Sequence, residues 1–334
     1  MTTHFLALET SCDETAAAVF THDLRVLSSV VASQNDLHVR FGGVVPEIAS
    51  RAHLRNLLPV IDGAIGRANL KLADIGYIAV HNTPGLVGAL LVGVTAAKAL
   101  AFALGVPLVA VNHVASHIYA CRIAAGRDIF PCVGLVVSGG HTALFRCDSP
   151  LSLTLLGTTR DDAAGEAFDK VGAILGLGFP GGPALEREAL GGDPKAFAFP
   201  RSFLDSPQLE FSFSGLKTAV LYACHGQGVS KMEPPPAGRR RADLAASFQE
   251  AVVAVLAGKC RQALRQTGLK RLAVGGGVIA NKRLRAELMG LDAEVFIPPM
   301  DLCTDNAAMA ALAVEKWKLG DFAPPELDAH PNFL

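Results

Sequence analysis

Residues 5–20 read FLALETSCDETAAAVF, in which a polar turn at 9–14 separates two apolar runs. Short apolar runs bounded by turn residues are typical of buried strands, so this stretch predicts two strands joined by a loop. The same arrangement returns at 133–145, VGLVVSGGHTALF, with its turn at 138–141. Two copies of a strand, turn and strand unit predict two similar lobes whose turns face one cleft.

Helical and strand-like segments alternate through the rest of the chain. This alternation favours an α/β fold with a mixed sheet in each lobe. The further strands are expected at 75–80, 108–111, 272–274 and 293–296, and the main helices at 46–64, 86–104, 161–175, 243–267, 281–289 and 305–319.

Composition excludes several classes of protein. The chain has 334 residues, half of them hydrophobic and 18% charged, so it can bury a large core and form about two domains. A net charge of -1 gives no global affinity for nucleic acid, so RNA binding would need a local basic patch or a partner. Seven scattered cysteines without a C-x-x-C pair indicate reduced thiols and the cytosol, and no signal peptide is visible at the N-terminus.

Three segments need separate interpretation. Residues 86–111 are apolar enough to suggest a membrane span, but Lys98 interrupts them and Gly105 and Pro107 end a helix, so we expect a buried helix followed by a strand. Residues 231–241, KMEPPPAGRRR, predict a mobile surface loop whose arginines are either a solvated charge run or contacts for RNA phosphates. The tail after Gly320 is expected to pack loosely.

His113 and His117 form an H-x-x-x-H pair on a helix that Asn112 can cap. Two imidazoles one helical turn apart can bind one metal ion, although an isolated pair of this kind is also common on ordinary helix ends. A metalloprotease would place its general base directly after the first histidine, where this chain has Val114. Peptidase chemistry therefore loses its main support, and a third ligand must come from elsewhere.

Three glycine clusters, at 136–142, 181–183 and 275–277, stand at the ends of predicted strands or before a helix. Glycine lets the backbone approach a ligand and direct its N–H groups at phosphate oxygens. Each cluster alone could be a plain turn, but three together favour a nucleotide cleft. Neither a P-loop nor a G-x-G-x-x-G fingerprint is present, which leaves the two-lobed actin-like and sugar-kinase-like class.

Seven segments in the right order resemble the bacterial tRNA N6-adenosine threonylcarbamoyltransferase family, the TsaD family. The resemblance runs from Leu6 to Trp317 and makes a chance match negligible. The segments are ETSCDET (9–15), GGVVPEIASR (42–51), NHVASH (112–117), SGGHT (138–142), DDAAGEAFDKVGAILGLGFPGG (161–182), FSGLKT (213–218) and CTDNAA (303–308). One departure is Thr83-Pro84-Gly85, where the family usually has Gly-Pro-Gly, and a local adjustment is expected there.

The resemblance implies a two-lobed actin-like fold, of the ASKHA or duplicated RNase H-like type, with the active site in the interlobe cleft. The lobes would be 1–114 with 300–334, and 115–299. The implied reaction moves a threonylcarbamoyl group from threonylcarbamoyl-AMP to N6 of the adenosine just 3′ of the anticodon, in tRNAs that read codons starting with A. The implied metal ligands are His113, His117 and Asp305; the substrate-binding positions are Val136, Val137, Ser138, Gly139, Gly140, Asp169, Gly182, Glu186 and Asn281; and the catalytic candidates are Glu14 and Asp13.

The resemblance also implies one divalent metal per subunit, a cytoplasmic location and no membrane association. Two histidines and one carboxylate with open positions are typical of non-haem Fe²⁺, which is favoured, although Zn²⁺ accepts the same ligands. The implied protein partners are an inert paralogue of the TsaB type and a small P-loop ATPase of the TsaE type. Two alternatives remain: an ATP-dependent kinase or ATPase of the same fold, which would not need the histidine pair, and an inactive scaffold, although the family's inert relative lacks that pair.

Overall fold

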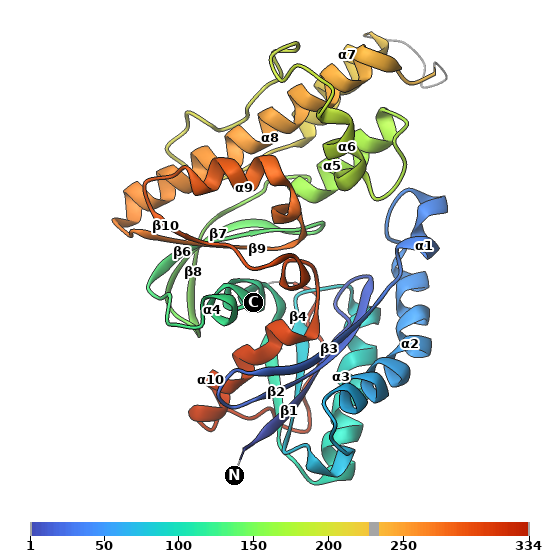
Figure 1. The fold of residues 1–334 in the computed structure, drawn as a ribbon, viewed down its shortest axis with the longest axis vertical. Coiled ribbons are helices and arrows are strands. Elements are labelled where there is room, and N and C mark those ends of the chain that lie inside the picture. The colour runs from blue at the N-terminus through green and yellow to red at the C-terminus, as the bar shows by residue number, and fades with distance from the viewer. Residues whose placement is uncertain (1, 227–233, 333–334) are drawn as a thin grey trace. The chain divides into compact units, whose positions relative to one another are not determined.

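Each strand, turn and strand segment lies inside one five-stranded sheet of the computed structural model, which describes residues 2–226 and 234–332 (Figure 1). In the first sheet β1 (His4–Glu9) is antiparallel to β2 (Glu14–Thr21) and parallel to β4 (Tyr77–Thr83). In the second, β6 (Cys132–Val137) is antiparallel to β7 (Thr142–Ser149) and parallel to β9 (Arg271–Gly275).

The two sheets repeat one topology. Their strand orders are β3-β2-β1-β4-β5 and β8-β7-β6-β9-β10, so the position of each strand in one sheet has a counterpart in the other. The outer strands next to β2 and β7, which are β3 (Val26–Ser33) and β8 (Ser152–Thr158), were not predicted from the sequence. The repeat nevertheless confirms the predicted duplicated α/β fold.

The chain divides into two units, with bounds 1–128, 150–152 and 298–334 for the first, and 129–149 and 153–297 for the second. The expected boundary at 114/115 would cut α4 (His113–Ala125), and the structure places it after this helix. The reason is that α4 packs against η5 (Ala307–Leu312) and β5 (Leu108–Asn112), both in unit 1. The remaining helical elements of unit 1 are α1 (Asn35–His38), η1 (Val39–Phe41), α2 (Pro46–Arg67), η2 (Leu72–Asp74), α3 (Val87–Leu104), η4 (Met300–Leu302) and α10 (Ala313–Lys318).

Side chains alternate along each strand, so both faces of the first sheet carry side chains, and other elements cover both faces. Leu6 and Leu8 of β1 point into an apolar core that they share with α2 and α3. On the opposite face Phe5 stacks on Phe20 of β2, with ring centroids 5.3 Å apart, and lies edge-on to Trp317 of α10. Burial on two sides explains why β1 and β2 are almost continuously apolar.

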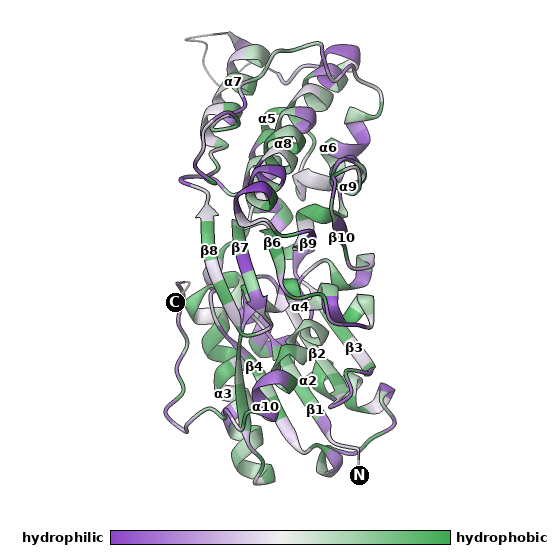
Figure 2. Cartoon of the chain, turned by 90° about the vertical axis from the view of Figure 1, so that its left-hand side faces the viewer, coloured by the Kyte–Doolittle hydropathy of each residue, from purple (hydrophilic) through white to green (hydrophobic). Residues whose placement is uncertain are grey.

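Helix α3 is, within the described residues, the one helix long and apolar enough to cross a membrane by length and composition, and 33% of it is buried. Figure 2 shows its predominantly hydrophobic character. Its residues Leu90 and Val94 enter the core of unit 1, and Gly105 ends it in the left-handed conformation before β5 begins. The predicted order of a helix and then a strand is confirmed, but the helix is buried on one side only, since Leu91 and Phe102 are exposed.

Unit 2 has its longest helix, α8 (Gly238–Thr267), packed on β6, β7 and β9. The other elements of this unit are α5 (Ala164–Ile174), α6 (Gly181–Ala189), α7 (Ser214–His225), η3 (Gly277–Ala280), α9 (Lys282–Met289) and β10 (Glu294–Phe296). Helix α7 was not expected from the sequence. Its start is ordered by Asp161, whose carboxylate accepts hydrogen bonds from the backbone N–H groups of Phe213 (2.8 Å) and Ser214 (3.2 Å).

The prediction of a loop at 231–241 is wrong for its last four residues. Lys231 to Glu233 lie outside the described residues, but Gly238 to Arg241 form the first turn of α8. Each arginine there has an intramolecular partner: Arg239 pairs with Asp243 (2.9 Å), Arg240 donates to the carbonyl of Ala223 (2.6 Å), and Arg241 pairs with Glu188 (3.0 Å). The three arginines thus have contacts within unit 2, and a role in RNA contact stays a prediction.

The C-terminal tail is also better fixed than expected. Its backbone binds β4 and β5: Ala323 N–H donates to Leu108 O and His330 N–H donates to Asn82 O, both at 2.8 Å. The Thr83 hydroxyl, at the position where the family usually has glycine, donates to Asn332 O at 2.9 Å. Thr83 is thus accommodated by a hydrogen bond to the tail.

Candidate functional site

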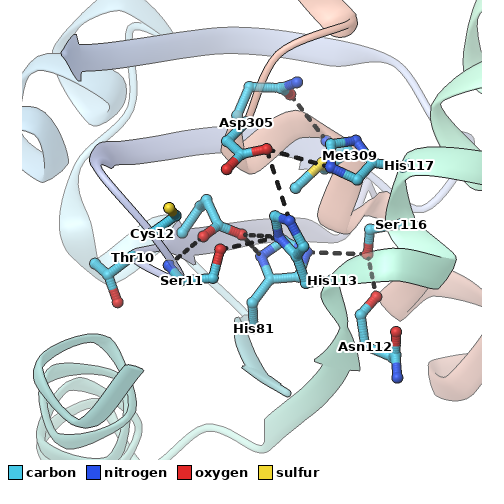
Figure 3. A network of polar contacts seen from close by, with 12 residues as sticks. Thr10, Ser11, Cys12, His81, Asn112, His113, Ser116, His117, Asp305 and Met309 are labelled. Atoms are coloured by element: carbon cyan, nitrogen blue, oxygen red, sulfur yellow. Dashed lines mark hydrogen bonds and ion pairs between the residues drawn. The ribbon is translucent and has the colours of Figure 1, made fainter. Parts of the chain in front are cut away.

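The two histidines and the aspartate predicted as metal ligands come together in unit 1 (Figure 3). Asn112 ends β5 and caps α4, because its Oδ1 accepts from Ala115 N–H at 3.0 Å. His113 is therefore the first residue of the helix and His117 follows one turn later, with ring centroids 4.7 Å apart. Asp305 precedes η5, and one potential ligand atom from each residue lies within 4.8 Å of the others.

The prediction of a helix at 305–319 is wrong at its start. The helical segment begins only after Asn306, which leaves Asp305 outside it. Asn306 caps η5, since its Oδ1 accepts from Met309 N–H at 3.1 Å, and a regular α-helix begins only at Ala313. Asp305 consequently lies outside the helix and directs its carboxylate toward the histidine pair.

The geometry fits a metal better than a set of hydrogen bonds. Asp305 Oδ1 lies 3.6 Å from His113 Nε2 and 3.2 Å from His117 Nε2. Neither ring nitrogen of the buried His117 is aligned for a hydrogen bond with any described residue. Buried polar atoms are normally partnered, and the convergence of these three ligand atoms suits a site for one cation. Two imidazoles and one carboxylate are a suitable donor set for Fe²⁺ or Zn²⁺.

The charges around the cluster favour a cation. Burial alone would lower the pKa of His113, but the carboxylates of Asp305 and Glu9 raise it to about 9. Burial lowers the pKa of His117. Burial opposes ionisation of Asp305, but the charge of His113 and the hydrogen-bonding proximity of His117 bring the pKa of Asp305 below its usual value. The centre thus combines the ionised carboxylates of Glu9 and Asp305 with a protonated His113, and a metal ion can replace that proton.

Two further polar residues, Glu9 and His81, extend the cluster and were not singled out from the sequence. Both are fully buried. Glu9 Oε2 lies 3.1 Å from His113 Nδ1 and 2.6 Å from His81 Nδ1. The pairing of β1 with β4 explains the contact, because Leu8 is opposite Val80 and the next residues are Glu9 and His81.

Asp13 and Glu14, the catalytic candidates, occupy the turn between β1 and β2 and the first residue of β2. Glu14 Oε1 accepts from the Ser33 hydroxyl at 2.9 Å, whereas its Oε2 is buried without a hydrogen-bond partner among the described residues. Burial, with the charges of Asp13 and Asp305, raises the pKa of Glu14 to about 7. Burial and the charge of Asp305 also raise the pKa of Asp13.

A second candidate site is a pocket of ≈ 170 Å³ lying wholly within unit 2. It is formed where the turn after β6 meets the starts of α5, α6 and α9. Five of the predicted substrate-binding residues line it: Gly139, Asp169, Gly182, Glu186 and Asn281. The other four do not. Val136 and Val137 are buried in β6, while Ser138 and Gly140 shape the turn that presents Gly139.

The polar residues of this pocket are fixed by the backbone around them. Asp169 Oδ1 accepts from Gly181 N–H at 2.7 Å, and Glu186 Oε1 accepts from Lys282 N–H at 2.6 Å. Asn281 caps α9 through its Oδ1, as its alternative role predicted, and its amide donates to Gln249 at 2.7 Å. The pocket is therefore held in one shape by the same side chains that line it.

The small and apolar residues of the lining were not predicted as substrate-binding positions, although most of them lie in segments that the sequence analysis quoted. Phe168 and Pro183 form apolar wall, and Gly165 allows close packing, because a Cβ there would lie 2.5 Å from Ser138 O. Gly277 belongs to a glycine cluster that the sequence did single out, but its neighbours in the lining have no distinctive signal. The remaining lining residues are Val278 and Ala280.

Comparison with solved structures shows the fold. Full-length HypF in its phosphate- and nucleotide-bound form matches with a TM-score of 0.61 at 14% identity, over 96% of this chain and 56% of that one. Component A of the (R)-2-hydroxyglutaryl-CoA dehydratase of Acidaminococcus fermentans matches with a TM-score of 0.54 at 14% identity, over 94% of this chain and 98% of that one. The expected actin-like fold is confirmed.

Comparison of sequences shows the family. The profile described as tRNA N6-adenosine threonylcarbamoyltransferase matches residues 25–312. Proteins of that name from Anaeromyxobacter dehalogenans and Rhodopirellula baltica are 52% and 49% identical, and the alignments cover 98% of this chain in both cases and 98% and 96% of the relatives. The chain belongs to the tRNA N6-adenosine threonylcarbamoyltransferase family.

Proposed function

We propose that this protein transfers a threonylcarbamoyl group from threonylcarbamoyl-AMP to N6 of the adenosine 3′ of the anticodon, in tRNAs that read codons starting with A. Membership of the family supports the reaction class. The observation in this chain that carries the proposal is the convergence of His113, His117 and Asp305, a metal centre that an actin-like kinase would not need.

His113, His117 and Asp305 would hold one divalent cation, for which Fe²⁺ is the favoured candidate and Zn²⁺ the second. The chemistry that such a cation supplies here is Lewis-acid polarisation of a substrate oxygen and stabilisation of charge on the leaving group. No redox step is required, so either ion suits the reaction. His113 and His117 would hold the ion from the start of α4, and Asp305 would hold it from the segment before η5.

Glu14 is proposed as the proton acceptor. The adenosine N6 nitrogen attacks the carbamoyl carbon, a C–N bond forms, and the mixed-anhydride C–O bond breaks with AMP as the leaving group. One N6 proton must be removed, and we assign its removal to the Glu14 carboxylate, whose Oε2 has no hydrogen-bond partner among the described residues. A pKa of about 7 suits a general base near neutral pH. Asp13 is proposed to support Glu14 from the same turn, since its negative charge helps to raise the Glu14 pKa.

The pocket of unit 2 is proposed to hold the adenosine part of the adenylate. Its volume of ≈ 170 Å³ is below the roughly 300–1,000 Å³ of sites for whole drug-sized ligands, so it suits a base and ribose better than the complete substrate. Asp169, Glu186 and Asn281 offer hydrogen-bonding groups at its rim, and Gly139 lets the backbone approach the ligand. Val136, Val137, Ser138 and Gly140 would support that turn. That the two sites act together in an interlobe cleft remains a prediction.

The proposed partners besides tRNA are an inert paralogue of the TsaB type and a P-loop ATPase of the TsaE type. A net charge of -1 supports assembly, because a near-neutral chain has little electrostatic attraction of its own for a polyanion. A cytoplasmic location without membrane association is proposed with them.

The test is a reconstitution with the purified chain, the two partners, threonylcarbamoyl-AMP and unmodified tRNA, followed by mass analysis of the nucleosides. We expect threonylcarbamoyl-adenosine to form only when the chain is present. ATP consumption with a small polar acceptor and no modified adenosine would instead support a kinase, and modification without this chain would support a scaffold role.

A further inference from the structure

The fully buried carboxylate of Glu9 lies directly behind the proposed metal ligand His113, and the mechanism above gives it no role. Burying an ionised carboxylate is unfavourable by several kcal/mol unless partners compensate for the lost water. Glu9 has two hydrogen-bond partners, Ser11 and His113, and a third close contact with His81. Its Oε1 accepts from Ser11 N–H, and its Oε2 faces His113 Nδ1 at 3.1 Å and His81 Nδ1 at 2.6 Å.

These contacts determine which nitrogen of His113 carries the proton in its neutral form. A carboxylate can only accept, so His113 Nδ1 must donate to Glu9 Oε2. The Ser11 hydroxyl, 3.0 Å from the same nitrogen, adds a second contact on this side. The remaining nitrogen, Nε2, then presents its lone pair to Asp305, as a metal ligand must.

His81 holds Glu9 from the other side. The Ser116 hydroxyl donates its single proton to Asn112 O at 2.9 Å, so its oxygen accepts from His81 Nε2 at 2.9 Å. The His81 ring is thereby fixed with its Nδ1 edge against Glu9. Ser116 and Asn112 belong to the same helix start as His113, so the contacts form a closed circuit around that ligand (Figure 3).

The turn that carries Ser11 is itself firmly packed. Ser11 O accepts from Leu86 N–H at 2.8 Å, and the Thr10 hydroxyl donates to Ala89 O at 2.9 Å. Gly85 permits this close approach, since a Cβ there would lie 2.5 Å from Ser11 O. His117 has no comparable support, because its Nδ1 is buried without a hydrogen-bond partner among the described residues.

We propose that Glu9, held in place by His81 and Ser11, is a positioning residue that orients His113 for metal binding. The inference rests on the proposed metal centre. Outer partners of metal-bound histidines commonly set ring orientation, and their loss typically weakens metal binding by about 10- to 100-fold. We expect Glu9→Gln to weaken binding by a factor in that range.

The test measures Co²⁺ binding to the metal-free full chain by competition with a chromogenic chelator, together with the d–d absorption spectrum of the bound ion. In Glu9→Gln the side-chain NH₂ group must face either Ser11 N–H or His113 Nδ1–H. One of these two hydrogen bonds is therefore lost, with little change in side-chain volume. The matched control is Glu315→Gln, which removes a carboxylate that accepts from Tyr119 of the same helix at 2.5 Å but contacts no ligand. It should leave the affinity and the spectrum unchanged.

Ser11→Ala provides a second variant if Glu9→Gln does not fold. It removes one contact to His113 Nδ1 and leaves Glu9 in place, so a smaller loss of affinity and an altered spectrum are expected. The proposal is overturned if a folded Glu9→Gln keeps the wild-type affinity and spectrum, or if Ser11→Ala does so where only that variant folds. It is also overturned if Glu315→Gln loses as much Co²⁺ affinity as Glu9→Gln. Failure of the wild-type chain to bind Co²⁺ would instead refute the metal centre itself.

Discussion

Replacing Glu14 by glutamine should remove the proposed proton acceptor and, at the same time, make the folded chain more stable at high pH. Glutamine has the shape of the protonated carboxyl group but cannot ionise. In the structure the Ser33 hydroxyl binds one carboxylate oxygen and the other is buried without a partner, so the ionised form is poorly stabilised.

The size of the stability effect follows from the pKa. Glu14 has an ordinary value of 4.5 and a folded value of about 7. Below pH 4.5 the group is protonated in both states and has no effect, whereas above pH 7 the folded chain carries a buried charge and is destabilised. At roughly 1.4 kcal/mol per pKa unit, the difference between the two pKa values corresponds to a loss of stability of about 3 kcal/mol. Because Glu14 is only half-buried and solvent screens its charge, we reduce this loss to about 1–2 kcal/mol.

We therefore expect Glu14→Gln to raise the free energy of unfolding by about 1–2 kcal/mol at pH 8 and to leave it unchanged at pH 4. Transfer activity should fall by about 10²- to 10⁴-fold, the usual contribution of a general base. Wild-type activity should rise with pH to a plateau above about 7. Chemical unfolding at both pH values and transfer assays from pH 5.5 to 8.5 measure these effects, with the exposed Glu326→Gln as control. Full activity in Glu14→Gln, or the same change in the free energy of unfolding at both pH values, would refute the reasoning.

Other predictions concern the pocket and the tail. Gly165→Ala should displace the turn at Ser138, because its Cβ would meet backbone atoms 2.5–2.8 Å away, and should weaken AMP binding measured by calorimetry; Gly215→Ala, with open space around its Cβ, should not. Ending the chain at Gly320 should lower the free energy of unfolding by several kcal/mol, at about 1 kcal/mol per lost hydrogen bond, as measured by denaturant titration. Unchanged stability of the truncated chain would mean that the tail packs loosely after all.

The sequence predicted the fold because buried strands and helices leave strong periodic signals. All strands except β3 and β8 followed from apolar runs, and the start of α4 followed from the capping residue Asn112. The failures occurred where tertiary contacts decide. The run Arg239 to Arg241 has no hydrophobic periodicity, yet it forms the start of α8, where its side chains contact Asp243, Ala223 and Glu188. The tail is ordered by backbone hydrogen bonds to β4 and β5.

For the site, recognisable ligand types could be found in the sequence, but their supporting residues could not. His113 and His117 stand at a spacing that indicates metal binding, whereas Glu9 and His81 are single polar residues at the ends of apolar strands. Only the register of β1 with β4 places them side by side. The pocket is similar: several of its lining residues belong to glycine clusters or family segments, but Val278 and Ala280 would pass for ordinary packing residues in any sequence.

The central claim is that a metal held by His113, His117 and Asp305 is required for transfer to tRNA. The most direct test follows modified adenosine in the reconstituted reaction after metal removal by a chelator and again after Fe²⁺ or Zn²⁺ is restored. We predict that removal abolishes transfer and that restoration recovers it in the wild type but not in folded His113→Ala or Asp305→Ala. Full transfer by the metal-free protein, or by both variants, would contradict the account.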